Sequence, residues 1–96
     1  MIRAFIRKSV DVAQKRAKNG GIRIDTISLL KHCAGEVIEA CEAYSKGNTD
    51  AFKMELGDIM CCALLICGFQ GFDAEEILIR CYEKNKARAD GIGDKL

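Results

Sequence analysis

The run from Ile59 to Cys67, IMCCALLIC, contains no charged side chain and no Gly or Pro, and it lies in a segment with the marks of a helix. That helix is predicted to begin after the capping sequence Asn48, Thr49, Asp50 and to end at about Gly68. A helix that is apolar on every side has to be surrounded by other apolar surfaces. Three further short helices cannot cover it completely, so a second subunit is expected on it. This predicts a homodimer or homotetramer.

Three other segments place apolar residues at helical spacing. The first is terminated by Asn19, Gly20 and Gly21, and a capping box of Asp73 and Glu76 opens the last. No strand pattern and no internal repeat is present. We therefore predict an all-α, four-helix bundle-like domain over residues 1–96, completed by oligomerisation, with a flexible tail from about 90 to 96. The three segments run from Ile2 to about Lys18, from Asp25 or Thr26 to about Lys46 before Gly47, and from Asp73 to about Ala89, and residues 69–72 form the last connection.

The second of the four segments has two faces. One is a continuous apolar seam, which we interpret as the core face. The other mixes acids with Leu and Ala, so it is also expected to be covered, with its carboxylates looking into a crevice. We interpret His32, on this second face, as a core residue rather than a partner of Glu36. The seam is Ile27, Leu30, Ala34, Val37, Cys41 and Tyr44, and the second face is Leu29, His32, Glu36, Glu39, Ala40 and Ala43.

Composition narrows the class of protein. Lys and Arg number 15 against 14 Asp and Glu, which gives no general attraction to nucleic acid or to an anionic membrane. The six cysteines fall in apolar helical runs and are interpreted as reduced core thiols. The N-terminus lacks the continuous apolar core of a signal peptide, and the run from Ile59 to Phe69 is too short to cross a bilayer. A soluble cytoplasmic protein is expected.

Two acidic pairs of the form acid-x-x-acid lie on consecutive predicted helices. Glu36 and Glu39 form the first pair, and Glu55 and Asp58 form the second. Residues three apart share a helix face, so two antiparallel helices would bring four carboxylates together. Like charges at close range repel unless a cation lies between them, and Mg²⁺ prefers oxygen ligands. The pattern predicts a carboxylate cage for Mg²⁺.

Lys84 and Arg88 lie four apart on the packing side of the last helix. Beside a metal site, such cations would hold the outer oxygens of a polyphosphate. Basic residues are also favoured at helix C-termini by the helix dipole, and these two alone favour that interpretation.

Three stretches, GEVIEA, ELGDIM and GFDAEEILIRCYEKNKAR, together resemble the MazG-like all-α nucleoside triphosphate pyrophosphohydrolases, whose signature is EExxE followed by ExxD. The resemblance covers roughly Leu30 to Arg88. Gly35 replaces the first Glu of the family's doublet. The resemblance implies that metal-binding and catalytic roles fall to Glu36, Glu39, Glu55 and Asp58, and that Lys84, Asn85 and Arg88 match a KN-x-x-R-like element near the phosphates.

The same resemblance implies an activity. A water activated by Mg²⁺, for which Mn²⁺ could substitute, would attack the α-phosphorus of an NTP or dNTP and release monophosphate and pyrophosphate, a house-cleaning reaction of the nucleotide pool. A di-iron bundle would need ExxH motifs, and the sequence has none. The alternative is a non-catalytic dimerisation or binding module whose acids pair with Lys84 and Arg88. Exposed pairs contribute only about 0–1 kcal/mol, a poor reason to cluster acids on a covered face.

Overall fold

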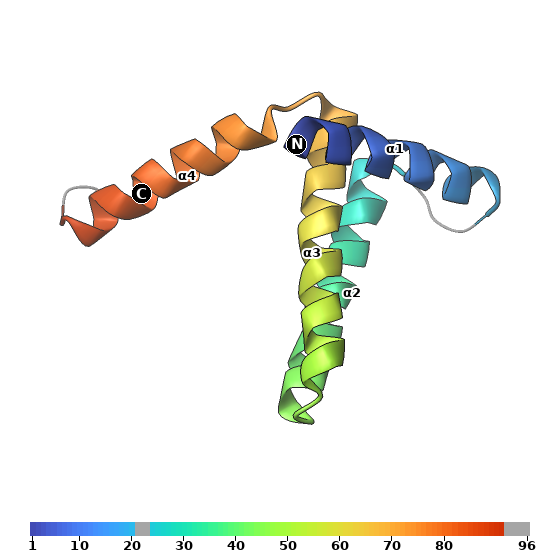
Figure 1. Cartoon of the computed structure of the whole chain (residues 1–96), viewed down its shortest axis with the longest axis horizontal. Coiled ribbons are helices and arrows are strands. Elements are labelled where there is room, and N and C mark those ends of the chain that lie inside the picture. Colours follow the sequence, from blue (N-terminus) through green and yellow to red (C-terminus); the bar gives the residue numbers. More distant parts are fainter. Residues whose placement is uncertain (21–23, 92–96) are drawn as a thin grey trace.

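The computed structural model describes residues 1–20 and 24–91. Four helices follow one another, α1 (Ile2–Lys18), α2 (Thr26–Ser45), α3 (Thr49–Gln70) and α4 (Ala74–Ala89), and the described ranges contain no strand (Figure 1). The all-α prediction is confirmed. Gly21 and residues 92–96, which make up most of the expected flexible tail, lie outside the described residues. None of the helices just named is long and apolar enough to cross a membrane.

Short polar side chains begin three of the helices. The Asp25 carboxylate accepts a hydrogen bond from the Ser28 N–H at 2.9 Å, and the Asn48 side chain accepts one from Ala51 at 3.1 Å. The Asp73 carboxylate accepts from the backbone N–H groups of Glu75 and Glu76. These caps satisfy N–H groups that have no partner inside the helix. The predicted N-termini are therefore confirmed.

The end of α3 differs from the prediction, because the helix continues to Gln70 and only Gly71 stops it. Gly71 has a φ of 73°, a left-handed conformation that glycine adopts without steric cost. The N–H of Phe72 then reaches back to the carbonyl of Cys67 at 2.9 Å, which satisfies one of the last carbonyls of the helix. The connection to α4 is correspondingly shorter than residues 69–72.

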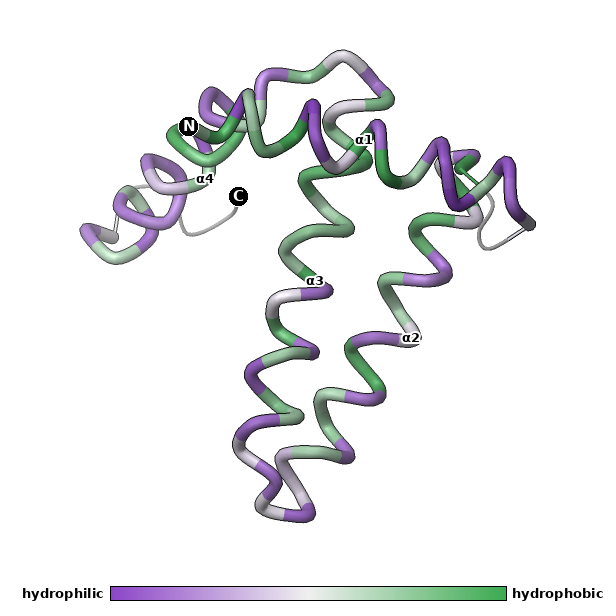
Figure 2. Tube along the Cα trace, turned by 45° about the vertical axis from the view of Figure 1, so that its right-hand side comes forward, coloured by the Kyte–Doolittle hydropathy of each residue, from purple (hydrophilic) through white to green (hydrophobic). Residues whose placement is uncertain are grey.

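Helices α2 and α3 form an antiparallel hairpin, which is the main packing unit (Figures 1 and 2). The buried residues of α2 are Leu29, Ala40 and Ala43, and Cys62 is the buried residue of α3. The Cys62 thiol donates to the carbonyl of Leu29 at 3.2 Å. Small alanines let the two backbones approach closely toward the hairpin turn. The face predicted to be covered, with Leu29, Ala40 and Ala43, is thus the one that packs.

The seam predicted as the core face of α2 is exposed in the single chain. Ile27 is 62% exposed and Tyr44 72% exposed. The prediction was wrong because the hairpin gives α2 one neighbour, α3, and the face with small residues packs against it.

The interpretation of the cysteines also changes: all six are free thiols, but only Cys62 is buried, and three of them are exposed. The exposed thiols are Cys41, Cys61 and Cys81.

Helix α1 crosses the hairpin at the C-terminal end of α3 (Figure 1). The crossing is close, because a Cβ built on Gly68 would lie 2.7 Å from Cγ2 of Ile6 and 2.9 Å from Cγ2 of Val10. Ala13, one turn further along α1, is buried. Figure 2 shows that α1 lies at the apolar end of α3. This contact covers part of the apolar run.

Helix α4 projects away from the hairpin and makes no comparable contact with another helix in the described part of the chain (Figure 1). Leu78, Ile79 and Tyr82 are each more than half exposed. The radius of gyration is 15.7 Å, whereas a compact chain of 100 residues has about 13 Å. The four helices therefore do not close into one bundle within a single chain.

We expect two glycines of α3 to respond oppositely to alanine. Gly57 has open space around its Cα, so Gly57→Ala should raise the free energy of unfolding by about 0.5–1 kcal/mol through helix propensity. Gly68→Ala gains the same propensity but must displace stiff β-branched side chains of α1, so it should be about 1–3 kcal/mol less stable than Gly57→Ala. Urea unfolding measures both. Equal stability of the two variants would contradict the close crossing.

Candidate metal centre

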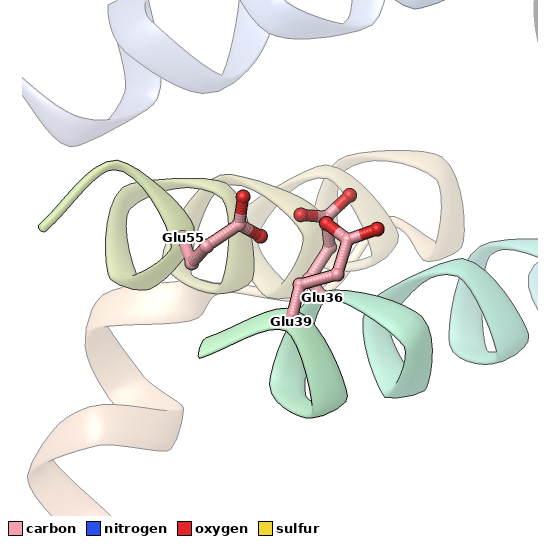
Figure 3. Close-up of side chains that lie close together, drawn as sticks. All are labelled: Glu36, Glu39 and Glu55. Carbon is pink, nitrogen blue, oxygen red and sulfur yellow. The ribbon is translucent and has the colours of Figure 1, made fainter. Parts of the chain in front are cut away.

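Three of the four predicted carboxylates come together between α2 and α3. Glu36 and Glu39 lie one turn apart on α2, and Glu55 faces them from α3 (Figure 3). One carboxylate oxygen of each lies within 4.8 Å of those of the other two. The i, i+3 spacing on α2 and the antiparallel packing produce this cluster, as the sequence predicts. We call Glu36, Glu39 and Glu55 the acidic cluster.

The proximity of these groups raises two pKa values. A hydrogen bond with the Glu55 carboxyl raises the pKa of Glu39 most, and repulsion by the Glu55 charge adds to it. The pKa of Glu55 is raised first by a hydrogen bond with Glu36 and then by burial, while its hydrogen bond with Glu39 acts the other way. The acidic cluster attracts positive charge, whether protons or a metal ion.

The acidic cluster fits a hard divalent cation. Oε2 of Glu55 is enclosed and has no hydrogen-bond partner among the described residues. A buried carboxylate oxygen without a partner is costly, and a cation would satisfy it. Mg²⁺ takes oxygen ligands at about 2.0–2.1 Å, so three carboxylate oxygens within 4.8 Å of one another could hold one such ion.

Asp58 does not join the acidic cluster and instead lines a neighbouring pocket together with Glu36. Its charge contributes to raising the pKa of Glu55, one turn earlier on α3, so it lies near the cluster. The pocket has a volume of about 390 Å³ and is formed where α1 crosses the hairpin. Glu36 is therefore shared by the cluster and the pocket. Of the four acids predicted to form the cage, three come together, and the fourth, Asp58, lies beside them.

His32 contacts the acidic cluster directly. Its Nε2 lies 3.1 Å from Oε1 of Glu36, one turn away on α2, and its side chain is 52% exposed whereas that of Glu36 is 12% exposed. The interpretation of His32 as a core residue was wrong. The i, i+4 spacing that makes this contact is visible in the sequence. His32 thus contacts one oxygen of a carboxylate of the acidic cluster.

The three predicted phosphate-binding residues lie elsewhere in the single chain. Lys84, Asn85 and Arg88 are exposed on the distal half of α4, the helix that projects away from the hairpin. They form no ion pair with the acidic cluster in the part of the chain that the structure describes. The pairing required by the non-catalytic alternative is therefore not present there.

Sequence analysis missed the contribution of α1. Ser9 and Arg16 of this helix line the pocket beside Glu36 and Asp58. The basic residues of α1 carry no motif, and helical spacing shows only which of them share a face. Their position depends on the angle at which α1 crosses α3, which the sequence pattern does not specify.

The raised pKa values predict a pH dependence of stability. The folded protein binds protons at Glu39 and Glu55 more tightly than the unfolded chain, so the metal-free protein should lose stability as pH rises through the raised pKa values. Urea unfolding in a chelator across this pH range measures the slope. Glu55→Gln should flatten it, and Glu83→Gln, an exposed change on α4, should not. Parallel slopes for all three proteins would contradict a repelling cluster.

Comparison with known proteins identifies a family that the sequence matches. The sequence profile of the MazG nucleotide pyrophosphohydrolase domain matches residues 24–92. Comparisons with curated proteins and with solved structures each give no match. The matched span contains α2, α3 and α4 with the acidic cluster and Asp58, and it leaves α1 outside. Because the match takes in well over half of the sequence, the chain belongs to the MazG nucleotide pyrophosphohydrolase family.

Proposed function

We propose that the protein is a Mg²⁺-dependent nucleoside triphosphate pyrophosphohydrolase that converts an NTP or dNTP into the monophosphate and pyrophosphate. The observation that supports this most is the acidic cluster, in which the buried Oε2 of Glu55 has no partner among the described residues. A cluster of this kind on the hairpin of a MazG domain is suited to a metal-bound triphosphate.

Glu36, Glu39 and Glu55 would hold the cation, with Asp58 in reach of the same region of α3. When bound, Mg²⁺, or Mn²⁺ in its place, neutralises charge on the phosphate oxygens and lowers the pKa of water. His32 would keep one oxygen of Glu36 fixed, since its Nε2 lies 3.1 Å from Oε1. That contact leaves the other oxygen of Glu36 to face the cluster or the pocket.

The reaction forms one bond from the water oxygen to the α-phosphorus and breaks the anhydride bond to the β-phosphate. The bridging oxygen leaves with the electron pair as part of pyrophosphate, and the water proton needs an acceptor. A carboxylate oxygen of the acidic cluster is the acceptor that this chain offers.

The outer phosphates need positive groups and hydrogen-bond donors. In this proposal Lys84 and Arg88 supply the positive charge and Asn85 supplies an N–H donor. In the single chain they lie on the projecting α4. Leu78, Ile79 and Tyr82 of the same helix are exposed and need an apolar partner. We therefore propose a homodimer or homotetramer in which α4 packs against a second copy.

Two groups of variants separate the proposed role of the acids in metal binding from that of the basic α4 residues in phosphate binding. Glu55→Gln and Asp58→Asn remove negative charge at nearly constant volume, so we expect pyrophosphate release to fall roughly 10²–10³-fold. Lys84→Ala or Arg88→Ala should mainly raise KM, because these groups bind the outer phosphates. Steady-state kinetics with an NTP and dNTP panel measures both effects.

Melting curves with and without millimolar Mg²⁺ accompany these kinetics. The wild type and the α4 variants should gain stability with Mg²⁺, whereas Glu55→Gln should gain less. Asp11→Asn, at an exposed acid of α1 that lies in neither the acidic cluster nor the pocket beside it, is the matched control and should behave as the wild type. Unchanged turnover in Asp58→Asn, or no Mg²⁺ effect on the wild type with or without nucleotide, would count against the proposal.

We also expect light scattering at micromolar concentration to give the mass of a dimer or tetramer. Paired charge substitutions on the exposed apolar face of α4, Leu78→Lys with Tyr82→Lys, should shift the mass toward the monomer, because charge is costly at a buried apolar interface. Gln14→Lys, at an exposed position of α1, serves as the control. A wild type that remains a monomer would overturn the assembly.

A further inference from the structure

The pocket beside the acidic cluster is built partly by a helix outside the family match. Residues 24–92 match the MazG domain, whereas α1 ends at Lys18. Four of the residues that line the pocket come from α1: Ser9, Val12, Ala13 and Arg16. The volume of about 390 Å³ falls in the range of about 300–1,000 Å³ of small-molecule sites. Helix α1 thus adds a wall that lies outside the span matched by the family.

The pocket has an apolar floor and a charged edge. Leu29, Cys62 and Leu65 of the hairpin supply the floor, and Glu36 and Asp58 lie at the edge toward the acidic cluster. A triphosphate held at that edge would leave its nucleoside next to the floor. An apolar floor is suited to the face of a base, whereas a polyphosphate would be poorly solvated there.

Two basic residues, Arg16 and His32, are among the described residues that line the pocket. His32 already contacts Glu36, with Nε2 at 3.1 Å from Oε1. Arg16 is exposed and has no ion-pair partner in residues 1–20 and 24–91. A guanidinium has five N–H donors in a planar fork and no acceptor. It therefore matches a base edge with a carbonyl and is mismatched to an edge with an amino group, as the pairing of Arg with guanine O6 and N7 illustrates.

Given the proposed function, on which this step rests, we propose that α1 completes a base-binding pocket in which Arg16 selects oxo bases over amino bases. Guanine nucleotides should be preferred over adenine nucleotides, and uracil nucleotides over cytosine nucleotides. Uracil differs from cytosine by a carbonyl in place of an amino group at C4. Guanine differs from adenine by the 6-carbonyl and also by a 2-amino group, which lies on the edge of the base away from O6 and N7. The preference arises because an amino group of a base facing Arg16 would place its N–H against a guanidinium N–H. Both groups are hydrogen-bond donors, so both would lack an acceptor.

Competition kinetics test the proposal with GTP against ATP and UTP against CTP. We expect kcat/KM to favour the oxo base about 5- to 150-fold in each pair. Arg16→Met keeps an unbranched apolar stem and removes the guanidinium, and it should reduce both ratios toward one. Lys15→Met is the control, because Lys15 is the neighbouring cation of α1 and lines a different pocket.

Titration of GMP and AMP without metal gives a second readout that does not need turnover. The wild type should bind GMP more tightly than AMP, and Arg16→Met should lose that preference while retaining the melting temperature. If no nucleotide is hydrolysed but GMP is still preferred, the proposed function fails and the base-selecting role of Arg16 stands.

Any of three results would overturn the proposal while leaving the pyrophosphohydrolase intact. One is turnover without any oxo preference. Another is an Arg16→Met variant that loses kcat/KM equally for all four nucleotides, which would assign Arg16 to the phosphates. A preference that survives in Arg16→Met would likewise remove Arg16 from base selection.

Discussion

The close packing of α2 against α3 is the constraint on which the site depends. Ala40 and Ala43 leave room for the facing helix, and the Cys62 thiol bonds to the carbonyl of Leu29 at 3.2 Å. This packing brings Glu55 opposite Glu36 and Glu39, although their charges repel. The apolar contacts along the hairpin therefore hold the carboxylates in a position that the acids alone would not adopt. The resulting electrostatic strain is what a cation can relieve.

Much of this arrangement could be predicted from local sequence patterns. Helix boundaries follow from short-range chemistry such as the Asp25, Asn48 and Asp73 caps, each of which acts within three residues. The acidic pairs follow from i, i+3 spacing and an antiparallel turn at Gly47. The family resemblance drew on the same acids, and the match over residues 24–92 confirms the family.

The wrong core face of α2 arose from the choice between two apolar faces of that helix. Periodicity identified both faces of α2, but it ranked the face with Ile27 and Tyr44 above the one with Ala40 and Ala43, since larger side chains bury more area. Close approach of two helices instead selects small residues. The position of Arg16 depends on a crossing angle, and the placement of α4 depends on surfaces beyond its own sequence. A helical spacing of three or four residues therefore predicts neither the position of Arg16 nor the placement of α4.

The crossing of α1 over Gly68 has a mechanical consequence. Ile6 and Val10 contact this glycine from the first half and the middle of α1, and Arg16 lies near the C-terminal end of the helix. A larger side chain at the Gly68 contact would therefore shift the C-terminal half of α1 and change the width of the pocket, while the carboxylates of the hairpin keep their places. In the proposed enzyme, a hydrophobic contact remote from the phosphates would thus tune the choice of substrate separately from the hydrolysis step.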